Sequence, residues 1–111
     1  MEVIRRPAPF GSVTRTRTLV LLQLLGSSYA RELARLLGVS VSVVQKALAS
    51  LERDDLVAAQ SVGRTRVYRL NPRSFARREL ELYLRRLVEA FPDLDAAAGF
   101  RRRPRKSGKP L

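Results

Sequence analysis

Residues 41–53 carry the side chains best suited to bind a ligand directly. On a helix, one face of this segment would present four small, amide or cationic side chains, namely Ser42, Val43, Gln45 and Lys46. A glutamine amide can pair with adenine, a lysine can bond guanine or a phosphate, and a valine methyl can touch thymine. The four could equally be ordinary surface residues of a helix. The nearby cations Arg31, Arg64 and Arg66 favour a face that enters the major groove of DNA.

The elements around this face predict how it is held. Residues 29–37 form one short amphipathic pattern, and Val41 to Arg53 form a second. The three residues between them include Gly38, which is typical of the tight, angled joint of a helix-turn-helix. Ser40 is placed to cap the second helix, because its hydroxyl can accept a hydrogen bond from a backbone N–H two or three residues on.

After residue 55 the apolar period changes from about 3.6 to 2, which indicates strands. We expect two strands, at residues 56–60 and 66–70, joined by a loop in which Gly63 takes a positive φ. The loop and second strand are basic. A basic hairpin directly after a helix-turn-helix is a wing, whose tip typically contacts the DNA backbone or the minor groove.

A first helix, Val13 to Leu25, is so rich in leucine and valine that we expect it to be the central buried helix, capped by Ser12 and ended by Gly26. Arg15 and Arg17 lie in its first turn, at the positive end of the helix dipole. They either contact a phosphate or belong to a solvated face, and we include Arg15 among the candidate DNA contacts.

The last predicted helix runs from Ser74 to Phe91, with Glu81 and Arg85 as a favourable pair one turn apart. Its apolar stripe exceeds what the three-helix unit needs, so we predict a homodimer interface. The candidate interface residues are Leu80, Tyr83, Leu84, Leu87, Val88 and Phe91. The alternative is that the stripe packs back on the first helix of the same chain.

The expected organisation has four parts. Residues 1–12 form a flexible arm, residues 13–71 a winged-helix domain, residues 72–91 the dimerisation helix, and residues 92–111 a basic disordered tail. The fold class is thus mainly α with a small β-hairpin wing.

Composition limits the possible functions. The net charge is +12, and residues 1–91 hold 16 basic and 8 acidic residues, so the excess is not confined to the tail. Such a charge attracts polyanions, above all nucleic acid. The chain has no Cys and no His, which removes disulfides, zinc sites built on sulfur or imidazole, and the usual nucleophile and base pairs. We therefore expect no enzyme, cofactor or metal. The apolar run 19–25 is too short to span a bilayer, and we interpret it as a core helix rather than a secretory signal.

The chain resembles the winged helix-turn-helix transcriptional regulators of the ArsR and MarR type in bacteria and archaea. The likeness covers about residues 13–91 and rests on ELARLLGVSVSVVQKALASLERDDLV (Glu32 to Val57) and VGRTRVYRLNP (Val62 to Pro72). It implies a homodimer on a pseudo-palindromic operator. By position, it assigns base reading to Ser42, Val43, Gln45 and Lys46, and backbone contacts to Ser40, Arg64, Thr65 and Arg66. The chain departs from the family in having Asp55 where Gly is usual, and in lacking the Cys and His ligands of metal-sensing members.

We therefore predict a dimeric, sequence-specific, DNA-binding transcriptional regulator, most simply a repressor, located in the cytoplasm on the nucleoid. Its partner is double-stranded DNA, no membrane is involved, and its small-molecule effector is unknown. Two alternatives remain: a nucleic-acid or chromatin protein without sequence choice, and a winged helix that docks another protein.

Overall fold

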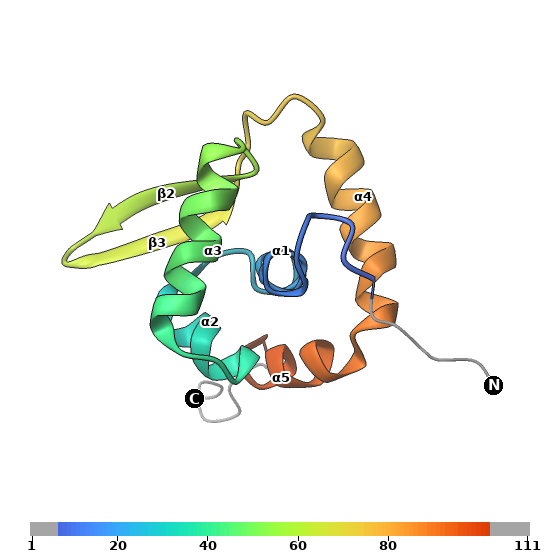
Figure 1. Ribbon diagram of the computed structural model, residues 1–111, viewed down its shortest axis with the longest axis horizontal. Coiled ribbons are helices and arrows are strands. Elements are labelled where there is room, and N and C mark those ends of the chain that lie inside the picture. The colour runs from blue at the N-terminus through green and yellow to red at the C-terminus, as the bar shows by residue number, and fades with distance from the viewer. Residues whose placement is uncertain (1–6, 103–111) are drawn as a thin grey trace, which may run out of the picture.

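The computed structural model describes residues 7–102, which form five α-helices, a short 3₁₀ helix and a small sheet. Helix α1 (Val13–Leu25) lies at the centre, with α2 (Ala30–Leu37) and α3 (Val41–Arg53) on one side and α4 (Arg77–Leu87) on the other. Helix α5 (Pro92–Arg102) closes the remaining side, and the hairpin of β2 and β3 projects away from the helices (Figure 1). This is the mainly helical winged fold that the sequence predicts.

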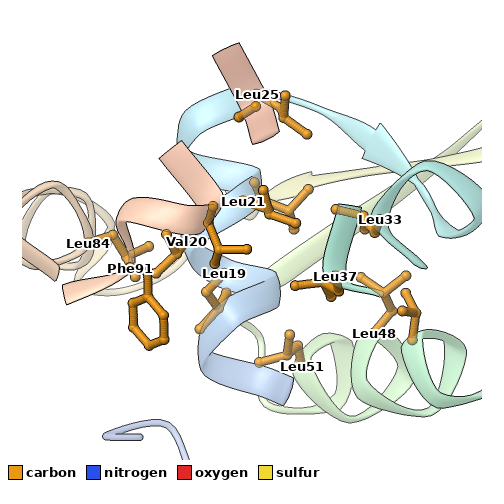
Figure 2. Close-up of a cluster of buried hydrophobic side chains, with 14 of the residues drawn as sticks. Leu19, Val20, Leu21, Leu25, Leu33, Leu37, Leu48, Leu51, Leu84 and Phe91 are labelled. Carbon is orange, nitrogen blue, oxygen red and sulfur yellow. The ribbon is translucent and has the colours of Figure 1, made fainter. Parts of the chain in front are cut away.

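Helix α1 is the core helix, as predicted. Leu19, Val20, Leu21 and Leu22 are all buried, which requires neighbours around most of its circumference. Leucines from α2, α3 and α4 surround it (Figure 2). Both predicted ends are confirmed: Ser12 accepts a hydrogen bond from the Arg15 N–H at 3.1 Å, and Gly26 follows the last residue with a φ of 85°. Burying this many apolar side chains is the main stabilising contribution in a domain of this size.

Helices α2 and α3 form the predicted helix-turn-helix. They are bent by 115° at the break between them, within the usual range for this motif. Gly38 adopts the left-handed conformation with a φ of 72°. This conformation has little steric cost for glycine, because glycine has no Cβ. Ser40 caps α3 by accepting from the Val43 N–H at 3.3 Å. The turn chemistry visible in the sequence therefore fixes the angle of α3.

The sheet has three strands, in the order β1 (Ser28–Tyr29), β3 (Thr65–Leu70), β2 (Val57–Val62), all antiparallel. The hairpin is longer than predicted, because Val62 pairs with Thr65 and leaves a two-residue turn in place of a five-residue loop. Gly63 takes the predicted positive φ, 62°. Strand β1 was not predicted: Tyr29 is extended and precedes α2, and two residues are too few to show a period of 2.

Asp55, which stands where the resembled family has Gly, adopts the left-handed conformation with a φ of 67°. It is the one non-glycine residue with a positive φ within residues 7–102. Asn71 donates from its side-chain amide to the Asp55 carbonyl at 3.1 Å and to its carboxylate at 3.0 Å. These bonds help to offset the cost of a left-handed aspartate between α3 and β2.

The predicted last helix is two elements, α4 and a 3₁₀ turn at Val88–Ala90. Pro92 does not end the structure; it is the first residue of α5. The prediction of a disordered tail was therefore wrong for residues 92–102. Proline is favoured at the first helical position, and Asp93 and Asp95 in the first turn suit the helix dipole. Leu94 and Ala98 are buried beside Phe91 and form a helical stripe that the basic composition of the segment obscured.

The apolar stripe of the predicted dimer helix divides into two parts. Leu84, Leu87 and Phe91 are buried within the chain, where α4 and α5 pack on α1. For these three residues the prediction of a dimer contact was wrong, and the alternative of packing on the first helix describes them. Leu80 and Val88 are partly buried, and Tyr83 is exposed.

The described part of the N-terminal arm is packed against the helices. The Phe10 ring lies 5.9 Å from the Tyr83 ring, and Phe10 is partly buried against the core. Residues 1–6 of the predicted arm and residues 103–111 of the predicted tail lie outside the described residues. Among residues 7–102 no single helix is long and apolar enough to cross a membrane, and α2 and α3 reach that length only as a bent pair.

Candidate nucleic-acid interface

An open groove of about 410 Å³ separates the N-terminal half of α3 from the hairpin. It brings together five of the residues that the sequence predicts to contact DNA, from three separate elements: Arg31, Gln45, Arg64, Thr65 and Arg66. Tyr29, Ala30, Val41 and Tyr68 complete its lining. Only the fold joins residues 31, 45 and 64, because they are far apart in sequence.

The solvent side of α3 is free of the rest of the described chain. Ser42, Gln45 and Lys46 are exposed, and Val43 is 41% exposed. Val44 and Leu48, on the other side, are completely buried against the core. The buried side anchors the helix and leaves a row of small and polar side chains available to base edges. Ser40 is exposed, but its hydroxyl is occupied by the capping bond and lies 3.2 Å from the Ser42 hydroxyl.

The cations of the hairpin differ in how they are held. Arg64 stands at the exposed turn and forms no hydrogen bond or ion pair with any residue in the range 7–102. Arg66 donates to the Glu52 carboxylate at 3.0 Å, and its guanidinium carbon lies 5.7 Å from the centre of the Tyr68 ring. Arg66 therefore ties the hairpin to α3, whereas Arg64 is available to an anion. This ion pair could not be predicted from the sequence, because the fold alone brings residues 52 and 66 together.

Two aromatic residues of the groove were missed. Tyr29, which is 40% exposed, and Tyr68, which is partly buried beside Arg66, both line the groove. The apolar period predicts Tyr29 as the first residue of a helix, whereas in the structure it is extended and belongs to β1. An aromatic ring beside cations, as at Tyr68, is a signal that the sequence contained.

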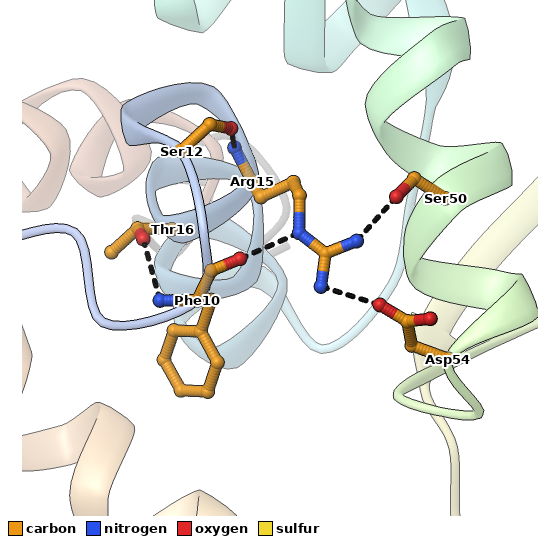
Figure 3. Close-up of polar contacts among 6 residues, drawn as sticks. All are labelled: Phe10, Ser12, Arg15, Thr16, Ser50 and Asp54. Atoms are coloured by element: carbon orange, nitrogen blue, oxygen red, sulfur yellow. Dashed lines mark hydrogen bonds and ion pairs between the residues drawn. The ribbon is translucent and has the colours of Figure 1, made fainter.

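Arg15 does not lie in the groove, so its assignment as a DNA contact is corrected. Its guanidinium donates to the Phe10 carbonyl at 2.6 Å, to the Ser50 hydroxyl, and to the Asp54 carboxylate at 2.7 Å (Figure 3). All three guanidinium nitrogens are thus engaged within the chain, and the side chain is 18% exposed. Arg15 joins the start of α1 to the end of α3. Arg17 similarly bonds Asp93 at 2.9 Å and joins α1 to α5.

Replacing Arg15 with alanine should lower the free energy of unfolding by about 1–3 kcal/mol, because three charge-assisted hydrogen bonds are lost, two of them to the end of α3. Urea denaturation followed by circular dichroism measures this. Arg35→Ala is the matched control, since Arg35 is 64% exposed and its ion pair with Glu32 is long, at 4.0 Å. This variant should change the free energy of unfolding by less than about 0.5 kcal/mol. Equal stability of the two variants would contradict the linking role of Arg15.

The geometry agrees with two comparisons of the chain with known proteins. The solved structure of the adhesin competence repressor AdcR from Streptococcus pyogenes is similar, with a TM-score of 0.60, 18% identity, and coverage of 81% of this chain and 66% of that one. A mutant of ZitR from Lactococcus lactis gives a TM-score of 0.57 at 18% identity, with coverage of 85% and 67%. The chain thus spans about two thirds of the length of these proteins. At this level of identity they support the fold.

No curated protein matches the chain significantly in sequence. The family model described as "Sugar-specific transcriptional regulator TrmB" matches residues 16–74, which include the whole helix-turn-helix and hairpin. The match covers more than half of the chain and names a family of regulators, not of enzymes. The sequence resemblance to ArsR- and MarR-type regulators is therefore supported at the level of fold and broad class, and the chain belongs to the TrmB family of transcriptional regulators.

Proposed function

We propose that this regulator binds a pseudo-palindromic DNA operator as a homodimer, reads its bases through α3, and represses transcription. The observation that carries the proposal is the groove between α3 and the hairpin, where Gln45, Arg31 and Arg64 meet. Gln45 and Lys46 would read bases, Ser42 and Val43 would pack against base edges, and Thr65 and the arginines would hold the backbone. On this proposal the protein is found with the nucleoid in the cytoplasm.

Electrostatics support DNA as the partner. Arg31, Lys46 and Arg64 are exposed and have no ion-pair partner within residues 7–102. Arg31 and Arg64 line the groove, and Lys46 follows the lining residue Gln45 on α3. Cations placed in this way attract the phosphates of a nucleic acid, and phosphate contacts release condensed counterions. Ion pairs elsewhere, such as Arg77 with Glu81, show that the fold neutralises arginines where a carboxylate is within reach. In the groove itself Arg66 is paired with Glu52, whereas Arg31 and Arg64 remain for an external anion.

Selection of bound duplexes from a random library tests the proposal. A homodimer with two recognition helices predicts a consensus of two inverted half-sites whose centres lie about 10 bp apart, one turn of the duplex. Recovery of duplexes without any consensus would favour the alternative of a nucleic-acid binder without sequence choice. The protein-docking alternative would be favoured if the chain retained no duplex from the library and instead captured a protein whose binding persisted after nuclease treatment.

Arg64→Ala should weaken binding to the selected operator and to random DNA alike. The slope of log K against log salt should fall by about 0.9, the value for one phosphate contact. Fluorescence anisotropy over a range of salt concentrations measures this. Arg78→Ala, which removes an exposed charge from α4, should leave the slope unchanged. If both variants shifted the slope equally, the effect would belong to net charge and not to the groove.

The homodimer proposal rests on the part of α4 that remains exposed. Phe75, Leu82 and Tyr83 are the large exposed apolar side chains of this region. Large apolar side chains left exposed near one helix favour a protein interface there. Leu82→Lys should therefore shift the protein from dimer to monomer in sedimentation equilibrium without loss of its helical circular dichroism. A folded variant whose molar mass in solution remained that of a dimer would rule out this face as the interface.

A further inference from the structure

A second groove lies away from the proposed DNA surface, between the C-terminal end of α1, strand β3 and helix α4. Its volume is about 340 Å³, which is within the range of small-molecule sites. Three arginines line it, Arg69 from β3 and Arg77 and Arg85 from α4. Arg69 follows Tyr68 directly, so the alternation of the strand directs it to the face opposite the DNA groove.

The charges of this groove are not balanced. Among residues 7–102, Glu81 is the only acidic residue that lines it, and its carboxylate accepts from Arg77 at 3.1 Å. The sequence had predicted a pair between Glu81 and Arg85, but within residues 7–102 Arg85 forms no hydrogen bond or ion pair. Arg69 uses one nitrogen to donate to Gln60 at 3.2 Å. Since a guanidinium has five N–H donors, each of the three arginines retains donors for a further acceptor.

The groove also has the mixed lining that a small ligand requires. Leu70 and Pro72 contribute apolar side chains beside the arginines, and Gln23 of α1 contributes an amide. We infer that this groove binds a small molecule that carries a phosphate or carboxylate group, held by Arg69, Arg77 and Arg85. Planar guanidinium groups bind such oxyanions through paired, charge-assisted hydrogen bonds. A bound anion would connect the hairpin to α4, because Arg69 and Arg85 belong to these two elements.

Titration with inorganic phosphate, at constant ionic strength and followed by amide NMR shifts of the whole chain, tests this inference. We expect saturable shifts centred on residues 23, 69, 77 and 85. Arg85→Gln should weaken binding about tenfold, since one charged partner is lost. Arg78→Gln is the matched control, because Arg78 is exposed on α4 but does not line the groove, and it should bind phosphate as the unaltered protein does. A parallel titration with malonate distinguishes a carboxylate ligand from a phosphate ligand.

Three results would overturn the inference. One is equal phosphate binding by the Arg85→Gln and Arg78→Gln variants, which would indicate attraction to net charge. Another is a set of shifts centred on residues 31, 45 and 64. The last concerns DNA affinity measured without phosphate. If Arg85→Gln lost as much DNA affinity as Arg64→Ala, this groove would belong to the DNA surface. The thermal midpoint of Arg85→Gln should match that of Arg78→Gln, because both side chains are exposed.

Discussion

Replacing Phe91 with alanine should lower the free energy of unfolding by about 3–5 kcal/mol, the usual cost of removing a buried aromatic ring. Phe91 is completely buried, between the 3₁₀ turn after α4 and the first residue of α5. It packs in the cluster that includes Leu84 and Val20 (Figure 2). Urea denaturation followed by circular dichroism gives the change in free energy.

Phe75→Ala is the matched control, because the same ring is removed from a fully exposed position. We expect it to change the stability of the monomer by less than about 0.5 kcal/mol. A Phe91 variant as stable as the Phe75 variant would show that α5 does not close the core. The stripe of α4 would then again be available to a partner, as the sequence alone suggested.

The double substitution Gln45→Ala and Lys46→Ala should lower affinity for the selected operator by about 10²- to 10³-fold and affinity for random duplexes much less. Each base-reading pair contributes about 1–3 kcal/mol of discrimination between bases, whereas non-specific binding depends mainly on phosphate contacts. Both side chains are exposed on α3, so the variant should fold normally. Competition between labelled operator and unlabelled random DNA measures the two affinities together.

Arg53→Ala is the control for this pair, since it removes a cation from the exposed C-terminal end of the same helix. It should retain the preference of the unaltered protein for the operator. Equal losses on operator and random DNA in the double variant would mean that Gln45 and Lys46 contribute only charge and surface, and base reading would have to be assigned elsewhere.

The elements with local signals were predictable from the sequence. The bounds of α1 and α3 follow from their apolar periods and from the hydroxyls of Ser12 and Ser40, and both caps are present in the structure. The positive φ of Gly63 was likewise predicted from the turn. Signals of this kind lie within a few residues of one another, so a sequence contains them in full.

Contacts between distant residues were not predictable in the same way. Arg15 reaches Asp54, and Arg66 reaches Glu52, only because the fold places α1 and the hairpin beside α3. Arg15 was assigned to DNA from its charge in the first turn of a helix, and Arg66 from the family resemblance and the basic hairpin. In the structure Arg15 is engaged within the chain, and Arg66 is partly so. Helix α5 was missed for another reason: the basic residues and prolines after Phe100 dominated the composition and hid the stripe of Phe91, Leu94 and Ala98.

The proposed function depends above all on the solvent side of α3 reading DNA sequence. The most direct measurement compares equilibrium binding of the full chain to its selected operator and to a scrambled duplex of equal length, at about 150 mM salt. The account predicts an operator affinity at least about 10³-fold higher, the lower limit for specific recognition. Equal affinities for the two duplexes, or no binding to either, would contradict it.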